Sequence, residues 1–453
     1  MNGALLIAAL AAPAAAAEIT VALDEALRRA DAENPQVQIA EWAVVAARAR
    51  KWQTMSYYGP TFSVDANALW WDEAIEASLT GGGTLDCTTW PAPMDQLCLG
   101  FSEPLIIRDQ ETTSVTLMAV QPITGLFAIS QGHVATAHLQ DAAEFDEQAK
   151  RAEVATQVVD AYFGALSAQQ MVEVAETVVT NLEGHERRAS AFHDAGLLQK
   201  NELLQLQVAL ANAQLGLRRA TDGRDLARGF VAMFIGEDED TVLPQDIPEE
   251  DMLAPSSGLD SDSAPGERPD IAAMEHRVQA AQAGRRATAA DLAPQVAAIA
   301  SWQRSEGLGS FSAPETMYAG VSASWEFWGW GRKAAALRES TAMLRQAELG
   351  LEAMSDAAPL EIRQTWDSVL ASWEAYTVGQ VTYEQAQENQ RIVSARFDSQ
   401  LASANDLLDA ESLLAQARMS RLTARYDYLR AVAAWQRAIG ATVEPLSSEG
   451  APQ

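Results

Sequence analysis

Two aspartates near the start of a predicted helix are the residues of this sequence best suited to chemistry with ions. Asp406 and Asp409 follow Ser403, a candidate helix N-cap. Carboxylates three positions apart lie on one face of a helix, where they can attract a cation together. The alternative is structural, because acids in a first turn favour the helix dipole and Ser403 with Asp406 is a variant of the capping box. The residues alone leave both interpretations open.

No catalytic or metal-binding motif accompanies these acids. The chain has no nucleophile elbow, phosphate loop or H-E-x-x-H pattern, and we therefore expect neither an enzyme nor a cofactor. The histidines are scattered in sequence and pair with no cysteine, which predicts surface residues rather than metal ligands. They are His133, His138, His185, His193 and His276.

The N-terminus and the cysteines indicate export. Residues 1–17 are predicted to be a signal peptide, because small apolar residues lead to an Ala-Ala-Ala cleavage site, although a basic segment is missing. Cys87 and Cys98 are close in sequence and no histidine lies near them. In an exported protein this pattern predicts one disulfide that closes a loop, with half of a metal site as the weaker alternative.

The charge of the chain is strongly acidic. It has 62 acidic and 32 basic residues, and a formal net charge of −30. This excess argues against nucleic-acid binding, which needs a basic surface. Residues 237–266 contain an acidic, proline-containing run. They are predicted to be a solvated linker or a small irregular segment, and an ion-binding site is the less favoured interpretation.

A second stretch resembles the region of the two aspartates and indicates an internal duplication. Residues 192–205 and 397–410 each place an acid before Leu-Leu at the start of a predicted helix. Matching residues also recur before and after these two turns, at fixed offsets along the sequence. We therefore divide the chain into a first repeat, residues 18–236, and a second repeat, residues 267–440, followed by a tail, residues 441–453.

The two repeats have the same predicted order of elements, namely a helix, two strands and a long helical hairpin. Alternation of apolar and polar residues predicts strands at 61–71, 113–121, 295–303 and 317–327. The hairpins turn near residues 193–201 and 397–405. The first long helix, with roughly 65 residues at a rise of 1.5 Å, is on the order of 100 Å long. Pro359 lies within its counterpart and predicts a kink or break there.

The predicted strands suggest a membrane location. They are about ten residues long, which is the length of a membrane-spanning β-strand, and aromatic residues cluster at their ends as in an aromatic girdle. The alternative is that these aromatic residues pack a soluble core. Four strands cannot close a barrel, and open strand edges are not tolerated in lipid. Two chains would pool eight strands and three would pool twelve, and the larger number leaves a lumen for passage.

The chain resembles the TolC-like outer-membrane channels from about residue 21 to residue 440. The resemblance rests on the duplicated turns and on four motifs. These are LDEAL at 23–27, NP at 34–35, QPI at 121–123, and the run from Arg396-Phe397 through DLLDA at 406–410 to Leu414. The implied fold is mostly α with a small β part. In it a trimeric, twelve-stranded outer-membrane β-barrel, with four strands per chain, is continued by a long α-helical barrel.

The resemblance also implies a function and partners. The chain is expected to be a passive trimeric exit duct of a tripartite efflux or type I secretion system. Such a duct lies in the outer membrane and extends into the periplasm of a Gram-negative bacterium. It docks with a periplasmic adaptor and an inner-membrane transporter, and its periplasmic helical tip is the gate. The alternative is a soluble periplasmic coiled-coil adaptor or scaffold, which would not need strands that face lipid. A third interpretation, an acidic cation-binding periplasmic protein, is supported only by the acidic run at residues 237–262.

Individual site residues follow from the same resemblance. The implied gate residues are Asp406, Asp409, Asn201, Glu202 and Phe397. The implied adaptor-contacting residues of the tip are Ala195, Gly196, Leu197, Leu401, Ala402 and Ser403.

Two tip residues depart from the family pattern. Gln400 stands where the second turn usually has glycine, and Ala402 stands where a gate arginine can occur. These departures put the geometry of the second turn and that particular gate contact in question.

Overall fold

The computed structural model describes residues 19–77, 88, 91–92, 94, 105–237, 242–249, 252, 254–255, 268–309 and 312–443. The chain divides into two compact units. The tip unit comprises residues 1–45, 142–275 and 350–453, and the sheet unit comprises residues 46–141 and 276–349. Each unit draws on both repeats, so the compact units do not coincide with the two copies of the duplication.

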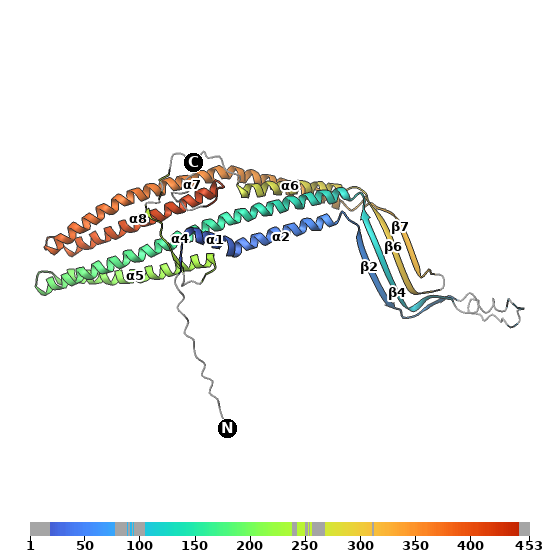
Figure 1. Ribbon diagram of the computed structural model, residues 1–453, viewed down its shortest axis with the longest axis horizontal. Helices are drawn as coiled ribbons and strands as arrows, with labels where there is room; N and C mark the ends of the chain where they lie inside the picture. The colour runs from blue at the N-terminus through green and yellow to red at the C-terminus, as the bar shows by residue number, and fades with distance from the viewer. Residues whose placement is uncertain are drawn as a thin grey trace, which may run out of the picture. The chain divides into compact units, whose positions relative to one another are not determined.

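The sheet unit contains the long strands in one antiparallel sheet (Figure 1). The strand order is β2-β4-β6-β7, and a short β3 pairs with β4 beyond the end of β2. A strand lies at each predicted position, but β4 and β6 are longer than predicted, and β7 ends at Ser324 instead of residue 327. The strands are β2 (Thr61–Trp70), β3 (Ile75–Ala77), β4 (Leu105–Pro122), β6 (Gln295–Leu308) and β7 (Glu315–Ser324).

The register of the sheet separates an apolar row from a polar row. Val64 pairs with Leu117, Leu117 with Trp302, and Trp302 with Met317. The row one position along joins Asp65, Thr116, Gln303 and Thr316. Because successive side chains of a strand point to opposite faces, these two rows lie on opposite faces of the sheet. The alternation in the sequence therefore produces two chemically different faces in this part of the sheet.

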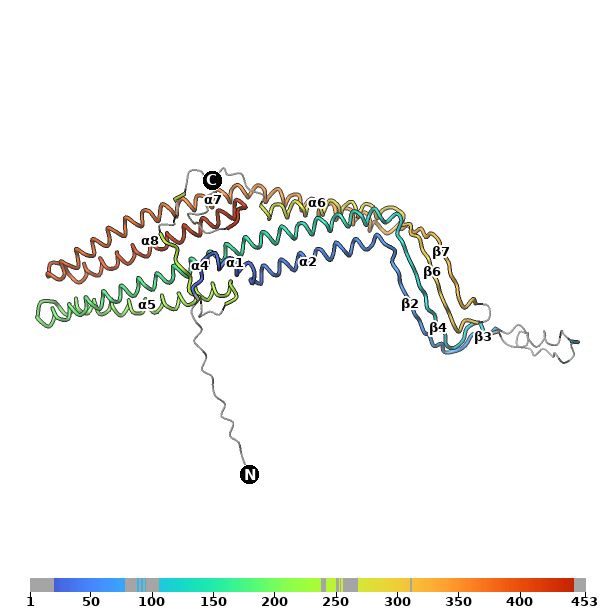
Figure 2. Tube along the Cα trace, viewed as in Figure 1, coloured from blue at the N-terminus to red at the C-terminus, as the bar shows by residue number. Residues whose placement is uncertain are grey.

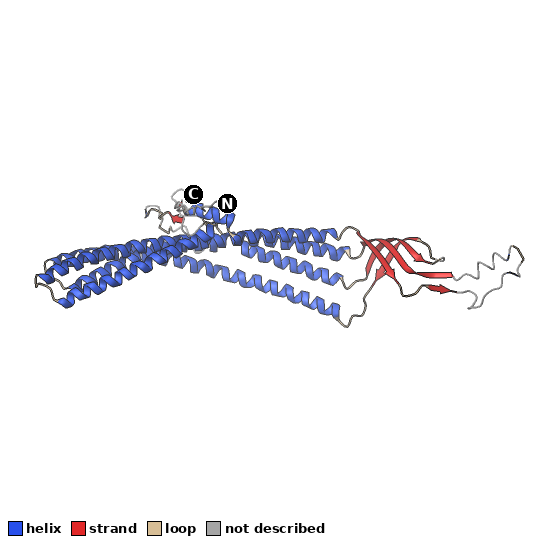
Figure 3. Cartoon of the chain, turned by 90° about the horizontal axis from the view of Figure 1, so that it is seen from below, coloured by secondary structure: helices blue, strands red, loops and turns tan. Residues whose placement is uncertain are grey.

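Helices make up most of the remaining described chain (Figure 3). Among the described residues, no helix is both long enough and apolar enough to cross a membrane. The helices are α1 (Leu23–Glu33), α2 (Pro35–Ser56), α4 (Leu126–Asp194), α5 (Lys200–Ile235), α6 (Pro269–Ala290), α7 (Arg332–Asp398) and α8 (Ala404–Ala438).

Helix α7 continues through Pro359, so the predicted break at this residue is wrong. A proline inside a helix removes one hydrogen bond and crowds the carbonyl group four residues earlier. Ala358, before the proline, and Ile362, one turn further on, are buried, with exposed fractions of 3% and 2%. The helix therefore packs one side against the rest of the tip unit at this point, which favours a continuous helix despite the lost hydrogen bond.

The core of the tip unit includes part of the segment predicted to be a linker. Strand β5 (Val242–Pro244) pairs in parallel with β1 (Ile19–Val21). The hydroxyl group of Tyr162 lies 2.7 Å from the carbonyl oxygen of Gln245 and 2.9 Å from that of Val21. Asp246, further along the same segment, pairs with Arg425 at 3.1 Å. The described part of this acidic segment is therefore packed onto the helices.

Two predictions fall on parts of the chain that the structure does not describe. The signal peptide at residues 1–17 and the disulfide between Cys87 and Cys98 both lie outside the described residues. They remain predictions.

Candidate functional site at the helical tip

The two helical hairpins of the tip unit end side by side (Figure 2). A small apolar cluster joins them and contains residues from α4, α5, α7 and α8. We call it the tip cluster, and it consists of Ala189, Leu206, Phe397, Ala404 and Leu407, each with an exposed fraction of 1% or less. The ring of Phe192 packs against that of Phe397 with their centroids 6.1 Å apart. Both turns are thus anchored on one shared core.

The turn from α4 to α5 is a Schellman motif. The amide of Leu197 donates to the carbonyl oxygen of Phe192 at 2.8 Å, and the amide of Gly196 donates to that of His193 at 2.8 Å. Gly196 has a φ of 75°, the left-handed conformation that this motif requires after a helix. Glycine is suited to this position because it has no Cβ.

The turn from α7 to α8 has the same geometry without a glycine. Leu401 donates to the carbonyl oxygen of Arg396 at 2.7 Å, and Gln400 donates to that of Phe397 at 2.9 Å. Gln400 has a φ of 60°. Glutamine at this position therefore permits the turn but strains its backbone, because the left-handed conformation costs a residue with a Cβ roughly 1–2 kcal/mol. The second turn, whose geometry Gln400 put in question, therefore matches the first turn of the same chain.

Asp406 forms the capping box that the sequence predicts. Ser403 Oγ accepts a hydrogen bond from the Asp406 amide at 3.2 Å, while Asp406 Oδ2 accepts one from the Ser403 amide at 2.9 Å. The Ser403 hydroxyl also lies 2.8 Å from Asp406 Oδ2. The backbone amide of Ser403, and next its hydroxyl, hold the pKa of Asp406 below its usual value. In this single chain Asp406 therefore has a structural role, whichever role it has toward ions.

The other predicted gate residues differ in their surroundings. Asp409 is exposed and accepts a hydrogen bond from Asn405 Nδ2 at 3.2 Å. Asn201 and Glu202 lie in the first turn of α5, and among the described residues no hydrogen bond or ion pair joins them to either aspartate. Phe397 is buried in the tip cluster. Within one chain, Phe397 can therefore act on the tip only through packing.

The predicted adaptor-contacting residues lie on the surface of the two turns. Leu197 and Leu401 follow the left-handed residue of each turn, and their exposed fractions are 59% and 69%. Ala195 and Gly196 are also exposed, whereas Ala402 and Ser403 are half-buried. The duplication thus presents one exposed leucine at the end of each hairpin.

A buried polar network near the tip was not predicted from the sequence. His185 Nε2 lies 2.8 Å from Glu411 Oε1, and both side chains have an exposed fraction of 4%. Gln390 Nε2 donates to Glu411 Oε1 at 2.5 Å, and Asn181 Nδ2 donates to Glu411 Oε2 at 3.3 Å. Arg188 contacts the His185 ring from the same helix. The network connects α4, α7 and α8, and so joins the two hairpins by polar contacts.

Glu411 is kept charged by these neighbours. Burial raises the pKa of its carboxyl group, but the hydrogen bonds from His185, Gln390 and Asn181 outweigh burial and leave the pKa below its usual value. A buried carboxylate is tolerated in a protein interior when hydrogen bonds and an opposite charge compensate for lost hydration.

The prediction that the histidines are surface residues is wrong for His185, and the prediction that they are scattered is wrong for His138 and His276. His185 is buried, with an exposed fraction of 3%. Leu182, His185 and Ala189 recur at helical spacing and are all buried, so the position of His185 on an apolar stripe was a usable sequence signal. In the sheet unit, His138 and His276 are neighbours, with their Nδ1 atoms 3.2 Å apart. No local pattern relates residues so distant in sequence.

Comparisons with known sequences find similarity to outer-membrane proteins of efflux and secretion. A profile of the family described as "Outer membrane efflux protein" matches residues 261–441. The alkaline protease secretion protein AprF of Pseudomonas aeruginosa is 25% identical over 343 residues, which cover 73% of this chain and 69% of AprF. The outer membrane efflux protein BepC of Brucella suis is 23% identical over 284 residues, which cover 61% of this chain and 62% of BepC.

Solved structures share the fold over nearly the whole chain. The outer membrane protein VceC of Vibrio cholerae superposes with a TM-score of 0.75 at 18% identity, over 93% of this chain and 97% of VceC. The CmeC outer membrane channel of Campylobacter jejuni superposes with a TM-score of 0.76 at 16% identity, over 93% of this chain and 86% of CmeC. The fold is therefore that of an outer-membrane channel, mostly α with a small β part, as predicted.

The profile, the relatives and the fold all make the chain similar to TolC-like outer-membrane efflux channels, in agreement with the resemblance seen in the sequence. The protein is located in the outer membrane and extends into the periplasm. This location is not that of a soluble periplasmic scaffold, which was the alternative interpretation of the sequence.

Proposed function

We propose that this protein is a passive trimeric exit duct of the outer membrane, serving a tripartite efflux or type I secretion system and gated at its helical tip. The observation that carries the proposal is the incomplete sheet. Strands β2 and β7 are the ends of the order β2-β4-β6-β7, and each pairs along its length on one side only. In lipid such edges have unsatisfied backbone groups, so further strands must complete the sheet.

Other copies of the chain can supply these strands. Because β2, β4, β6 and β7 alternate in direction, β7 of one copy is antiparallel to β2 of the next. Pairing between copies therefore continues the pattern found within the chain. Three copies give twelve strands, enough for a lumen, whereas the eight strands of a dimer leave an interior filled by side chains.

The apolar row of the sheet suits contact with lipid. Val64 and Met317, at its two ends, have exposed fractions of 66% and 80% in the single chain. The segment after β7 adds exposed aromatic side chains, which suit the level of the lipid head groups. These aromatic residues are Trp325, Phe327, Trp328 and Trp330. Exposed apolar surface of this extent needs a partner, which the bilayer supplies.

The tip has features that a cation-selective gate requires. Asp406 and Asp409 are exposed near the start of α8, one helical turn apart. Three copies would bring six carboxylates to the end of the duct, and a ring of carboxylates favours cations. Asn201 and Glu202 lie on the neighbouring hairpin of the same tip, and Phe397 holds the two hairpins together.

The partners follow from the tip surface and from the relatives. Leu197 and Leu401 are exposed apolar residues at equivalent positions, which suits docking of a periplasmic adaptor onto the two turns. An inner-membrane transporter would then deliver cargo through the adaptor. AprF is named for the secretion of a protease and BepC for efflux, so relatives of both kinds support a duct that accepts cargo from such a transporter.

Oligomeric state and conductance test the proposal directly. The full chain is extracted from outer membranes in mild detergent, its mass is measured by light scattering, and it is inserted into planar bilayers. The expected result is a trimer that forms discrete ion-conducting channels. A monomer that partitions with soluble periplasmic proteins, or a trimer without conductance, would overturn the proposal.

A further inference from the structure

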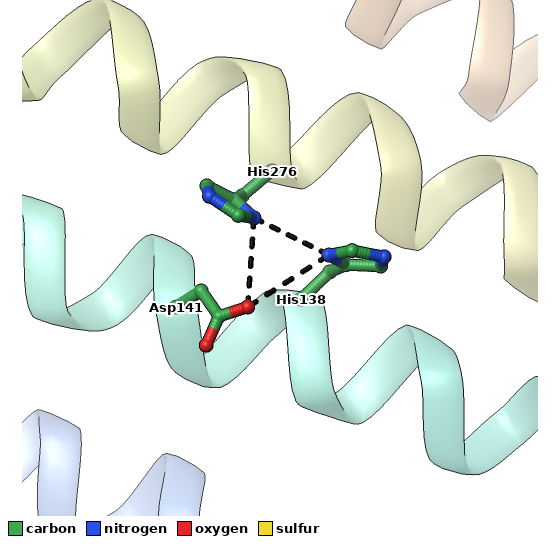
Figure 4. A group of neighbouring side chains, drawn as sticks. All are labelled: His138, Asp141 and His276. Carbon is green, nitrogen blue, oxygen red and sulfur yellow. Dashed lines mark hydrogen bonds and ion pairs between the residues drawn. The ribbon is translucent and has the colours of Figure 1, made fainter.

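We propose that His138, Asp141 and His276 bind a divalent transition-metal ion in the sheet unit, and we take Zn²⁺ as the probe. His138 and Asp141 lie one turn apart on α4, and His276 lies on α6 (Figure 4). The three side chains point toward one another, with one possible ligand atom from each within 4.8 Å of the others. These three residues belong to the sheet unit and are separate from the gate residues of the tip unit.

The distances between the three atoms fit a metal ion. The two Nδ1 atoms are 3.2 Å apart, and Asp141 Oδ2 lies 3.8 Å from Nδ1 of His138 and 3.6 Å from Nδ1 of His276. A point equidistant from three atoms with these separations lies about 2.1 Å from each, which is the length of Zn–N and Zn–O bonds. An ion could therefore enter with small adjustments of the side chains.

The ligand types indicate which metals the site would take. Two imidazole nitrogens and one carboxylate oxygen suit zinc and similar transition metals, whereas magnesium and calcium prefer sites made entirely of oxygen. The exposed fractions of the side chains are 28% for His138, 39% for Asp141 and 25% for His276. An ion can thus reach the site from solvent, and a water molecule can complete its coordination.

Hydrogen bonding explains the cluster less well than a cation does. The Nδ1 of an imidazole carries either one hydrogen or one lone pair in the ring plane. If one histidine donates to the other, the acceptor Nδ1 has no hydrogen left for the carboxylate. A cation at the centre satisfies all three atoms at once. Among the described residues, the ion pairs of Asp141 are with these two imidazoles only.

A bound ion would cross-link the two repeats. Helix α4 belongs to the first repeat and α6 to the second, and the rings of His138 and His276 already lie 5.5 Å apart and tilted by 38°. An ion that binds the folded chain and not the unfolded chain shifts the unfolding equilibrium toward the fold. Zinc should therefore raise the melting temperature of the protein.

Isothermal titration calorimetry tests the proposal. Zinc chloride is titrated into full-length protein in detergent, purified without a histidine tag and treated with a chelator. We expect one ion per chain, no comparable heat from magnesium, and a rise in melting temperature. His138→Ala and His276→Ala should each weaken binding by about tenfold or more, since loss of a residue that only orients a metal ligand already lowers metal affinity 10- to 100-fold.

Matched variants show whether the zinc is at this cluster. His193→Ala removes a histidine of the α4–α5 turn and should leave the affinity unchanged. A protein with both Cys87→Ser and Cys98→Ser should also bind normally. Wild-type affinity in the double variant of His138 and His276, or loss of the ion in the cysteine variant alone, would overturn the proposal. X-ray absorption of the zinc-loaded protein should show two imidazole ligands, and their absence would count equally against it.

Discussion

Gln400 occupies the same left-handed position after α7 that Gly196 occupies after α4. Their φ angles are 60° and 75°, and each is followed by a leucine whose amide donates to the carbonyl oxygen five residues earlier. The two repeats therefore share one backbone geometry at the tip, although only the first has the residue best suited to it.

Replacing Gln400 with glycine should stabilise the second turn. The left-handed conformation costs a residue with a Cβ roughly 1–2 kcal/mol, and glycine would relieve this strain. The greater freedom of glycine in the unfolded chain offsets part of the relief, so we expect the free energy of unfolding to rise by about 0.5–1 kcal/mol. Amide hydrogen exchange of residues 395–408 should slow accordingly. Gly196→Gln is the matched control and should speed exchange at the first turn. No atom lies within 4 Å of a Cβ built at Gly196, so this cost would come from the backbone alone.

Phe397→Ala should loosen the connection between the two hairpins. The ring has an exposed fraction of 1% and is the largest member of the tip cluster, and removing a buried phenylalanine costs about 3–5 kcal/mol. We expect faster hydrogen exchange in both turns and more frequent channel openings in bilayers. Leu401→Ala is the control, because that side chain is 69% exposed and its loss should change exchange little. Equal effects of the two substitutions would show that Phe397 is not an anchor of the tip.

The parts of the tip that were predictable from sequence are those fixed by residues close together in the chain. Ser403 and Asp406 are three positions apart, and the capping box needs nothing else. The strands of the sheet unit were likewise predictable, because apolar and polar residues alternate along them. The turn at Gln400 could not be settled from sequence, because its geometry depends on backbone hydrogen bonds that tolerate a non-glycine residue at a cost.

The parts that could not be predicted depend on how helices far apart in sequence face one another. His185 and Glu411 meet because α4 and α8 present those faces to each other in the tip unit. His138 and His276 similarly meet across α4 and α6 in the sheet unit. A periodic pattern shows which side of a helix is buried, but it does not show which residue of another helix covers that side. Buried polar pairs of this kind therefore need coordinates.

The two aspartates of the tip should be separable by mutation. Asp409→Asn removes a charge without touching the capping box, so we expect lower cation selectivity in bilayers and unchanged hydrogen exchange at the start of α8. Ser403→Ala removes the cap and keeps both charges, and it should destabilise the helix start by about 1 kcal/mol with unchanged selectivity. The combined variant of Asp406→Asn and Asp409→Asn should lose more selectivity than Asp409→Asn alone. Wild-type selectivity in that double variant would contradict a gate role for the aspartates.

The network around Glu411 should make the tip sensitive to acid. The hydrogen bonds from His185, Gln390 and Asn181 hold the pKa of Glu411 below its usual value despite burial. A group whose pKa is lower in the folded chain than in the unfolded chain stabilises the fold at pH values above its pKa in the unfolded chain. This stabilisation is lost as the pH falls through its pKa in the folded chain. We therefore expect hydrogen exchange near residues 181–190 and 405–415, corrected for intrinsic rates, to accelerate as the pH is lowered below the ordinary range for glutamate.

Glu411→Gln tests whether Glu411 causes the acid sensitivity of the tip, because the substitution keeps the shape of the side chain and removes the titrating group. Its tip should be less stable than wild type at neutral pH, and its stability should depend less on pH. His185→Ala should be the more damaging change, since it leaves Glu411 buried without its partner, and breaking a buried pair costs about 3–5 kcal/mol. Replacing His185 and Glu411 together with leucine should recover much of that loss. If the acid sensitivity of the tip is the same in Glu411→Gln as in wild type, another group controls it and the network has a packing role only.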